Sequence, residues 1–288
     1  MKTVAYLAIA AAAFTAEVAA RSVCYDPAHN NPMTIEAINA DMDAIKAAGF
    51  TGIRTYFTKY ADTDLGSIAA QKGLNASIGI PYGPQAKDTE AHVLAAIAAA
   101  QKGTVQQVYV GNENLAQIKQ VPADMLDIIR RIKAAAPNVK VGTVQRQTEL
   151  LDKNQAVTGF KELVDECDII GVNLHPFFNP NTKASGAIGV LDAQWKQLHS
   201  REVEALYPGV AAKLAITEVG WPTAGSLAEN TGTPEGAKLV FDGFNTWADE
   251  NNLADGRTFY FQMFDQPQRE NPVEKAFGIA SATRSSKY

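Results

Sequence analysis

The chain has 288 residues, of which 46% are hydrophobic and 20% charged; this composition allows a large buried core and excludes an intrinsically disordered protein. Its formal net charge is -5 and it contains no run of Lys or Arg, which argues against nucleic acid as a partner. Barrels of alternating strands and helices use about 250 residues as one domain, so the length favours a single domain.

The N-terminus has the three parts of a secretory signal peptide. Lys2 supplies a positive charge, residues 4–14 form an apolar run rich in Ala, and residues 18–20 end the segment with small side chains. The run is shorter than the roughly 20 apolar residues of a membrane span. We therefore expect residues 1–20 to be removed on secretion and residues 21–288 to form the folded domain; the alternative is an N-terminal helix that stays on the domain.

From residue 22 onward, short apolar strands alternate with Ala-rich amphipathic segments. This alternation is typical of parallel strands joined by crossover helices. The predicted strands span residues 22–26, 52–57, 74–80, 106–112, 139–145, 168–175, 213–219 and 257–264. Their number and order predict an α/β fold, a single (β/α)8 TIM barrel that forms one catalytic-size unit.

Helix start and stop signals lie between these strands. Thr34 is expected to cap a helix that ends at Gly49, since Thr accepts well at the first position and Gly tolerates the conformation after the last. Pro122 is placed in the first turn of another helix, where its missing N–H is not needed. Further helices are predicted over residues 88–102, 122–136 and 233–250.

The chain contains two cysteines, Cys24 and Cys167. They are predicted to lie on the first and sixth barrel strands, which are not neighbours. A disulfide needs Cα atoms within about 7 Å, so we expect two buried free thiols. Asn75 opens an N-x-S sequon at the start of a predicted strand, and the sequence leaves its glycosylation open.

A barrel of this kind carries its functional groups at the C-terminal ends of the strands, where the loops surround an open mouth. The side chains at these ends are Asp26, Arg54, Tyr56, Tyr82, Asn112, Glu113, Gln145, Asn173, His175, Glu218, Trp221 and Asp265. Glu113 and Glu218 each end an apolar strand that carries little other charge. They follow the fourth and seventh strands, so we expect them to face each other across the mouth.

Two facing carboxyl groups are what glycoside hydrolysis requires, one to protonate the leaving oxygen and one to attack or stabilise the anomeric carbon. A carboxyl separation of roughly 5 to 5.5 Å would predict retention of configuration, and a wider gap inversion. Each glutamate alone could be an ordinary rim residue in a salt bridge. The pair, with Asn112 beside Glu113 and Trp221 near Glu218, favours catalysis.

The segments around these glutamates resemble glycoside hydrolase family 17, the β-1,3-glucanase family of plants, fungi and related microbes. Residues 110–113 (VGNE) are similar to the family's Asn-Glu at the end of the fourth strand, and residues 217–222 (TEVGWP) to its Glu-x-Gly-Trp-Pro at the end of the seventh. The resemblance implies that Glu113 is the acid/base and Glu218 the nucleophile of a retaining enzyme that acts on β-1,3-glucan.

The resemblance covers nearly the whole mature chain. The segments that resemble the family's first, second, sixth and eighth strands and its closing segment are residues 23–25, 54–56, 171–178, 261–265 and 274–279. The loop after the eighth strand departs from the family, whose members commonly carry an acidic residue and a Lys there. In this chain Asp265 is followed by Gln266, so Asp265 stays a candidate and Gln266 receives no role.

Several neighbouring residues are expected to bind the sugar. Asn112 can hydrogen-bond a sugar 2-hydroxyl, an interaction that strengthens in the transition state. Arg54 is expected to pair with a carboxylate and lower its pKa. Pyranose rings could stack on Tyr56, Phe177, Phe178, Trp221 or Phe264, with Trp221 as the main platform and a place in the core as the alternative. Asn173, His175 and Asp265 complete the expected substrate-binding set.

No metal or other cofactor is implied, because the four histidines show no ligand spacing. The expected partner is a β-1,3-glucan polysaccharide or oligosaccharide, and the protein is expected to be a secreted monomer without a membrane anchor, in the extracellular space or the cell wall. Three alternatives remain: a transglycosylase that remodels β-1,3-glucan, a barrel enzyme acting on xylan or mannan, and a catalytically silent glucan-binding protein. The sequence leaves open endo against exo action, chain-length and branching preference, and whether the target is the organism's own wall.

Overall fold

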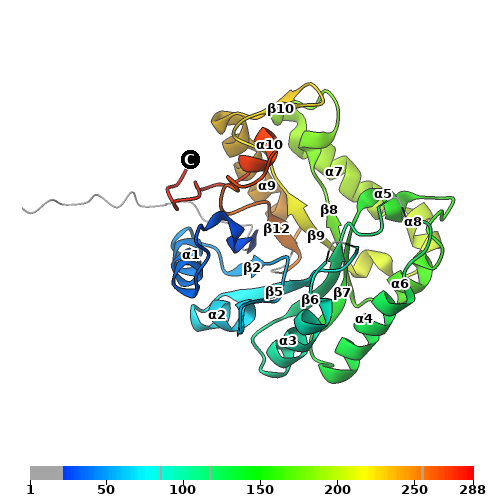
Figure 1. Ribbon diagram of the computed structural model, residues 1–288. Helices are drawn as coiled ribbons and strands as arrows, with labels where there is room; N and C mark the ends of the chain where they lie inside the picture. Colours follow the sequence, from blue (N-terminus) through cyan, green and yellow to red (C-terminus); the bar gives the residue numbers. More distant parts are fainter. Residues whose placement is uncertain (1–21, 85, 117, 254–255) are drawn as a thin grey trace, which may run out of the picture.

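The computed structural model describes residues 22–84, 86–116, 118–253 and 256–288; the predicted signal peptide, residues 1–20, lies outside them. Eight parallel strands close into a central barrel, with helices packed around its outside (Figure 1). In chain order the barrel strands are β1 (Ser22–Cys24), β2 (Gly52–Arg54), β5 (Asn75–Ile80), β6 (Gln107–Asn112), β7 (Lys140–Arg146), β8 (Ile169–Asn173), β9 (Leu214–Val219) and β12 (Thr258–Tyr260). The predicted single (β/α)8 barrel is confirmed, since all neighbouring strands in the ring pair in parallel.

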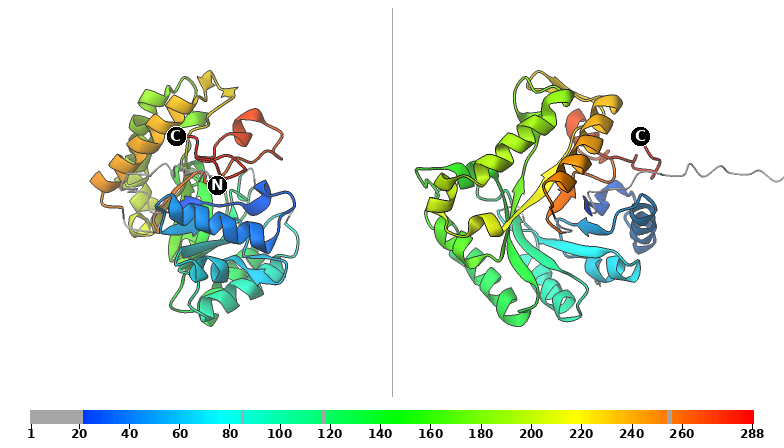
Figure 2. Two further views of the ribbon diagram at one scale, coloured as in Figure 1. Left: turned by 90° about the vertical axis from the view of Figure 1, so that its left-hand side faces the viewer. Right: turned by 180° about the vertical axis from the view of Figure 1, so that it is seen from behind.

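The helices follow the strands and form the outer layer, as the views from the side and from behind show (Figure 2). They are α1 (Ile35–Ala47), α2 (Leu65–Gln71), α3 (Thr89–Gln101), α4 (Ala123–Ala135), α5 (Gln147–Leu151), α6 (Phe160–Glu166), α7 (Ala187–Leu198), α8 (Arg201–Leu206), α9 (Pro234–Glu250) and α10 (Pro272–Lys275). Two short hairpins, β3–β4 (Lys59–Tyr60 and Thr63–Asp64) and β10–β11 (Ser226–Leu227 and Asn230–Thr231), were not predicted. Within the described ranges, none of the helices combines the length and apolarity that crossing a bilayer requires.

The predicted helix ends are close to those observed. The Thr34 side chain accepts a hydrogen bond from the N–H of Ala37 at 3.1 Å, and Gly49 has a φ of 90°, which glycine adopts without strain. Pro122 is the residue before α4 rather than a member of its first turn. The boundary prediction was therefore off by one residue there.

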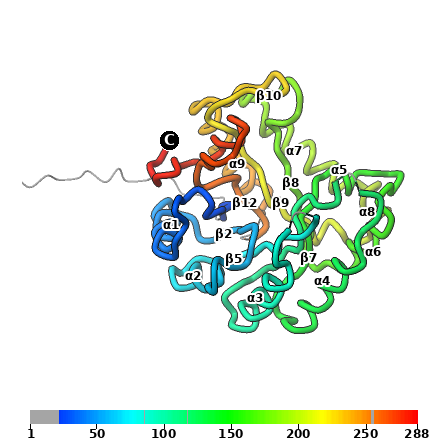
Figure 3. The backbone as a smooth tube through the Cα atoms, in the orientation of Figure 1, coloured from blue at the N-terminus to red at the C-terminus, as the bar shows by residue number. Residues whose placement is uncertain are grey.

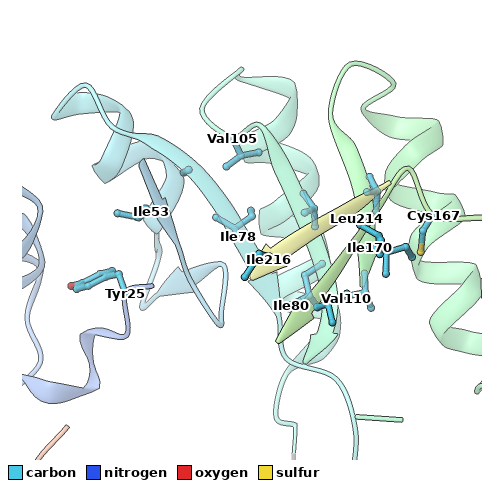
Figure 4. Packing of buried hydrophobic residues seen from close by; sticks show 14 of the residues in the cluster. Tyr25, Ile53, Ile78, Ile80, Val105, Val110, Cys167, Ile170, Leu214 and Ile216 are labelled. Carbon is cyan, nitrogen blue, oxygen red and sulfur yellow. The ribbon is translucent and has the colours of Figure 1, made fainter. Parts of the chain in front are cut away.

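The core fills the barrel and the layer between strands and helices. Ile53, Ile78, Ile170 and Ile216 come from four different strands, and each is at most 1% exposed. Ile78 and Ile216 lie near each other among the strands, with Ile53 and Ile170 to either side (Figure 4). Burial of this kind stabilises by about 25 cal/mol per Å² of apolar surface, so the strands are held in the register that brings their C-terminal ends to one mouth.

The C-terminal segment packs between the loop after β12 and α1, beside the junction of the first and last strands. β1 and β12 share one pair of partner residues, Val23 and Tyr260, so backbone pairing at this seam is short. The C-terminal segment runs beside α1 (Figures 1 and 3). There Arg284 Nε donates to the carboxylate of Asp41 at 2.7 Å, and Asp41 is fully buried. His29 Nε2 lies 3.0 Å from the same carboxylate, which satisfies a charge that would be costly if unpaired.

Both cysteines are free and buried, as the sequence predicted. Cys24 lies in β1 and donates its S–H to the carbonyl of Thr217, whereas Cys167 is the residue after α6 and not part of a barrel strand. Burial raises the pKa of each thiol to about 12.

We therefore expect neither thiol to react with a disulfide reagent at about pH 8 until the protein is denatured, when both react. Titration with and without denaturant measures this, and rapid labelling of native protein would contradict it.

Candidate active site

The parallel strands bring the predicted catalytic pair and four of its predicted neighbours to the C-terminal mouth of the barrel. These six residues form one hydrogen-bonded group. They are Arg54 from β2, Asn112 and Glu113 from the end of β6, Asn173 and His175 from the end of β8, and Glu218 from β9. Local sequence explains why they meet, because each lies at or just after the point where its strand ends.

Glu218 is a buried carboxylate with two strong partners. Arg54 Nη1 donates to Oε1 at 2.7 Å and His175 Nε2 lies 3.0 Å from Oε2, while the residue is 6% exposed. Burial by itself raises the pKa of Glu218, but the His175 hydrogen bond and the positive charge of Arg54 outweigh it, so that the pKa is lowered to about 2. Glu218 is therefore an anion at neutral pH.

Arg54 links Glu218 to Asn112 within this group. Besides its bond to Glu218, Nη1 donates to the carbonyl of Thr217 at 3.1 Å, and Nη2 donates to Oδ1 of Asn112 at 2.6 Å. Its guanidinium lies over the ring of Tyr56, 4.6 Å from the centroid, in cation–π geometry. Tyr56 was expected to offer a face to sugar; one of its faces instead supports Arg54.

The backbone around Glu113 has an irregular conformation that sets the direction of its side chain. Gly111 has a φ of 75° and Glu113 a φ of 54°, and the register between β6 and β7 shifts just before Asn112. Such irregularities redirect side chains beside functional sites, and a left-handed residue other than Gly costs about 1–3 kcal/mol. The N–H of Glu113 is held by the carbonyl of Val144 at 2.9 Å. Asn173 Nδ2 then donates to Glu113 Oε1 at 2.8 Å.

The two carboxyl groups are linked through neutral amides. Asn173 Nδ2 lies 3.2 Å from Oδ1 of Asn112, which itself accepts from the arginine bound to Glu218. Thr217 Oγ1 donates to Oδ1 of Asn173 at 2.9 Å and so fixes which way this amide points. Sequence reasoning missed Thr217, because it looks like an ordinary strand residue. Glu218 is thus paired directly with a cation, whereas the hydrogen bond to Glu113 comes from a neutral amide.

Three of the predicted sugar-stacking aromatics are in the core instead. Phe177, Trp221 and Phe264 are 0%, 1% and 1% exposed. The Trp221 ring packs edge-on against Phe177, and Phe264 stacks on His29 with centroids 4.4 Å apart. A covered ring has no face for a sugar, so the expectation for these three, Trp221 above all, is wrong. Phe178, which follows Phe177 directly, is 41% exposed.

Asp265 supports the C-terminal segment rather than the catalytic group. Lys287 Nζ donates to both of its carboxylate oxygens, at 2.8 and 3.0 Å, and the N–H of Gly278 donates to Oδ1 at 3.0 Å. The predicted substrate-binding role of Asp265 is therefore corrected. Gln266 is buried, and its amide donates to the carbonyl of Asp26.

A small depression opens beside the catalytic group. It has a volume of about 200 Å³ and is lined by residues that include Arg54, Tyr56, Tyr82 and Asn112. Among the described residues, no group of three or more His, Cys, Asp or Glu side chains is placed to hold a metal ion. The lining of the depression offers hydrogen-bonding and aromatic groups to a ligand.

Comparisons with known proteins agree on the chemical class. Residues 22–278 match the model of the BtgE/BtgC glycoside hydrolase domain. The protein named probable beta-glucosidase btgE of Aspergillus fumigatus is 28% identical over 238 residues, which cover 81% of this chain and 39% of that protein. The protein of the same name from Neosartorya fischeri is 29% identical over 192 residues, 66% of this chain and 33% of that protein. The chain thus spans well under half the length of these relatives.

Solved structures agree on the fold. The glycoside hydrolase family 17 β-1,3-glucanosyltransferase of Rhizomucor miehei superposes with a TM-score of 0.74 at 20% identity, covering 94% of this chain and 96% of that one. An active-site mutant of that enzyme, solved in complex with laminaritriose, gives 0.73 at 19% identity, with the same coverage of both chains. An endo-laminarinase from Formosa gives 0.73 at 16% identity, covering 92% of this chain and 84% of that one.

Proposed function

The chain belongs to the BtgE/BtgC glycoside hydrolase domain family, and from this premise we propose that it cleaves β-1,3-glucan with retention of configuration, using Glu218 as nucleophile and Glu113 as acid/base. It is a glycosidase with a barrel fold, as the sequence predicted. The family 17 resemblance stated from the sequence is matched by family 17 enzymes among its structural neighbours.

The proposed reaction has two steps. In the first, Glu218 Oε attacks the anomeric carbon while Glu113 gives its proton to the departing glycosidic oxygen, so a glycosyl ester forms and the glycosidic bond breaks. In the second, Glu113 takes a proton from water or a sugar hydroxyl, whose oxygen attacks the anomeric carbon and releases Glu218. Water gives hydrolysis, and a sugar hydroxyl gives transfer.

One observation carries the assignment of roles. Glu218 is clamped between Arg54 and His175, which favours the anion needed for attack, whereas Glu113 contacts the neutral amide of Asn173. A nucleophile must be ionised before the reaction, so we assign that role to the carboxylate that the cation holds and the acid/base role to Glu113, the other carboxyl group of the pair.

Support for the substrate comes from similar proteins. The structural neighbours are named a β-1,3-glucanosyltransferase and an endo-laminarinase, and one was solved with laminaritriose. The curated relatives are named β-glucosidases, which makes release of single glucose units the second candidate activity. Endo-type cleavage, secretion to the extracellular space or wall, and a monomeric state are part of the proposal, with the N-terminal pattern as the support for secretion.

The test is incubation with linear β-1,3-glucan oligosaccharides, with products separated by size and their anomers followed by proton NMR. We expect shorter oligosaccharides whose new reducing ends appear first as the β-anomer. Products longer than the substrate would add transfer to the activity, and glucose alone would favour the second candidate. The α-anomer appearing first would refute retention. Cleavage of xylan or mannan with the glucan unchanged would refute the substrate.

A further inference from the structure

A second depression adjoins the one beside the catalytic group. Its volume is about 650 Å³, within the range of small-molecule sites. Tyr82, in the loop after β5, lines both depressions, so the two meet at this ring. The larger one lies between the start of α3 and the first turns of α4, helices that run side by side outside the barrel (Figure 1). We call it the Tyr82 groove, and the residues used below are Tyr82, Glu90, Asp124, Asp127 and Arg131.

The walls of the Tyr82 groove have the chemistry that recognises a neutral polyol. The Tyr82 hydroxyl donates to Asp124 Oδ1 at 2.6 Å, which fixes the ring, and the ring itself is half-buried. Arg131 Nη2 donates to both oxygens of Glu90, at 2.9 and 2.8 Å. A pyranose presents C–H groups to an aromatic face and hydroxyl donors to carboxylates, so one flat ring among fixed carboxylates suits it. The Arg131 charge offsets part of the acidic charge, which makes a cation a poorer match.

The linkage chemistry gives the direction of the chain. A sugar whose 2-hydroxyl is bound by Asn112 has its 3-oxygen on the neighbouring ring carbon. In a β-1,3-glucan that 3-oxygen carries the next residue toward the non-reducing end. Tyr82 lines both the depression beside Asn112 and the Tyr82 groove, so a chain that leaves the cleaved residue at its 3-oxygen can extend across this ring into the groove.

We infer that the Tyr82 groove binds the non-reducing-end part of a β-1,3-glucan chain, with Tyr82 as the stacking ring, and that it makes the enzyme favour longer chains. This inference rests on the proposed function and names where that function obtains its chain-length preference. Contacts with these remote residues raise kcat/KM only for chains that are long enough to reach the groove.

The test is kcat/KM measured over β-1,3-glucan oligosaccharides of increasing length. Wild-type values should rise with length and level off once the groove is filled. Tyr82→Ala should lower kcat/KM about tenfold more on the longest substrates than on the shortest cleaved substrate, mainly through KM. Tyr82→Phe, which keeps the ring and loses only the hydrogen bond to Asp124, should retain most of the length dependence.

Neighbouring arginines on α4 provide a matched control. Arg130 and Arg131 have equally exposed side chains, 45% each. Arg130 pairs with Glu162 and Glu166 outside the groove at 2.9 and 3.0 Å and lies 3.7 Å from groove-lining Asp127, whereas Arg131 pairs with groove-lining Glu90 at 2.8 Å. Arg131→Ala should lower kcat/KM on long chains only. Arg130→Ala should leave kcat/KM unchanged on both long and short chains. Equal loss on short and long chains, or no loss with Tyr82→Ala, would overturn the inference.

Calorimetric binding of the same oligosaccharides to Glu218→Gln protein separates this inference from the proposed function. Binding that weakens on adding Tyr82→Ala supports the groove even if wild-type protein cleaves no β-1,3-glucan, in which case only the proposed reaction fails. If Tyr82→Ala leaves the affinity for the oligosaccharides unchanged, the inference about the groove is refuted. The proposed cleavage reaction is not affected by that result.

Discussion

Replacing Glu218 with Gln is expected to lower kcat on a β-1,3-glucan oligosaccharide by at least about 1,000-fold, because an amide can neither attack the anomeric carbon nor form the glycosyl ester. The change is nearly isosteric, so Arg54 and His175 keep a polar partner. The measurement is initial rates of product formation by chromatography, together with a thermal unfolding curve for each protein.

Asp265→Asn is the matched control for this variant. It also converts a carboxylate to an amide, but this carboxylate lies in the segment after β12 and is paired with Lys287 instead of Arg54, so the rate should stay within about threefold of wild type even if stability falls. A Glu218→Gln protein that folds and keeps more than about a tenth of the activity would rule out Glu218 as the nucleophile.

Azide rescue of alanine variants distinguishes the roles of the two glutamates. In Glu218→Ala, azide can take the place of the lost carboxylate and attack the anomeric carbon, with release of an α-glycosyl azide. In Glu113→Ala, Glu218 still forms the ester, and azide displaces it with a second inversion to give the β-azide. The opposite pattern would exchange the assigned roles.

Replacing Arg54 with Met is expected to lower kcat/KM by about 100-fold or more and to destabilise the fold by about 3–5 kcal/mol, because it leaves the buried Glu218 without its cation. The loss includes the hydrogen bonds from Arg54 to Asn112 and to the carbonyl of Thr217. Chemical denaturation measures the free energy of unfolding, and steady-state kinetics measures kcat/KM.

The same variant should change the pH dependence in a fixed direction. In the wild type the pKa of Glu218 is lowered from 4.5 to about 2, so its ionised form contributes stability that is fully present above about pH 4.5 and is lost as the pH falls through about 2. Without the Arg54 charge, burial raises this pKa. The acid limb of kcat/KM and the acid unfolding midpoint should therefore both move to higher pH in Arg54→Met.

Arg269→Met is the comparison for these pH measurements. Arg269 lies 3.7 Å from the Asp26 carboxylate at the barrel rim, and its side chain is 53% exposed. Solvent screens such a pair, so the acid limb of kcat/KM and the stability of Arg269→Met should match those of the wild type closely. If Arg54→Met keeps the wild-type acid limb, Arg54 does not set the protonation of Glu218.

Much of the architecture was readable from the sequence because it is encoded locally. Strand alternation, the Thr34 cap and the Gly49 stop depend on residues near one another in the chain, and all were confirmed. Glu113 and Glu218 were also readable, since a carboxylate that ends an apolar strand of a parallel barrel has to lie at the mouth. The pairing of Arg54 with a carboxylate followed for the same reason.

What the tertiary structure alone decided depends on elements far apart in sequence. Whether Trp221 offers a face or is covered depends on Phe177, 44 positions earlier, and whether Asp265 is free depends on Lys287, 22 positions later. The Tyr82 groove likewise needs Glu90 of α3 and Arg131 of α4 side by side. An apolar or charged residue has the same local pattern whether a distant segment covers it or not, because burial is a property of the packed chain and not of its neighbours in sequence.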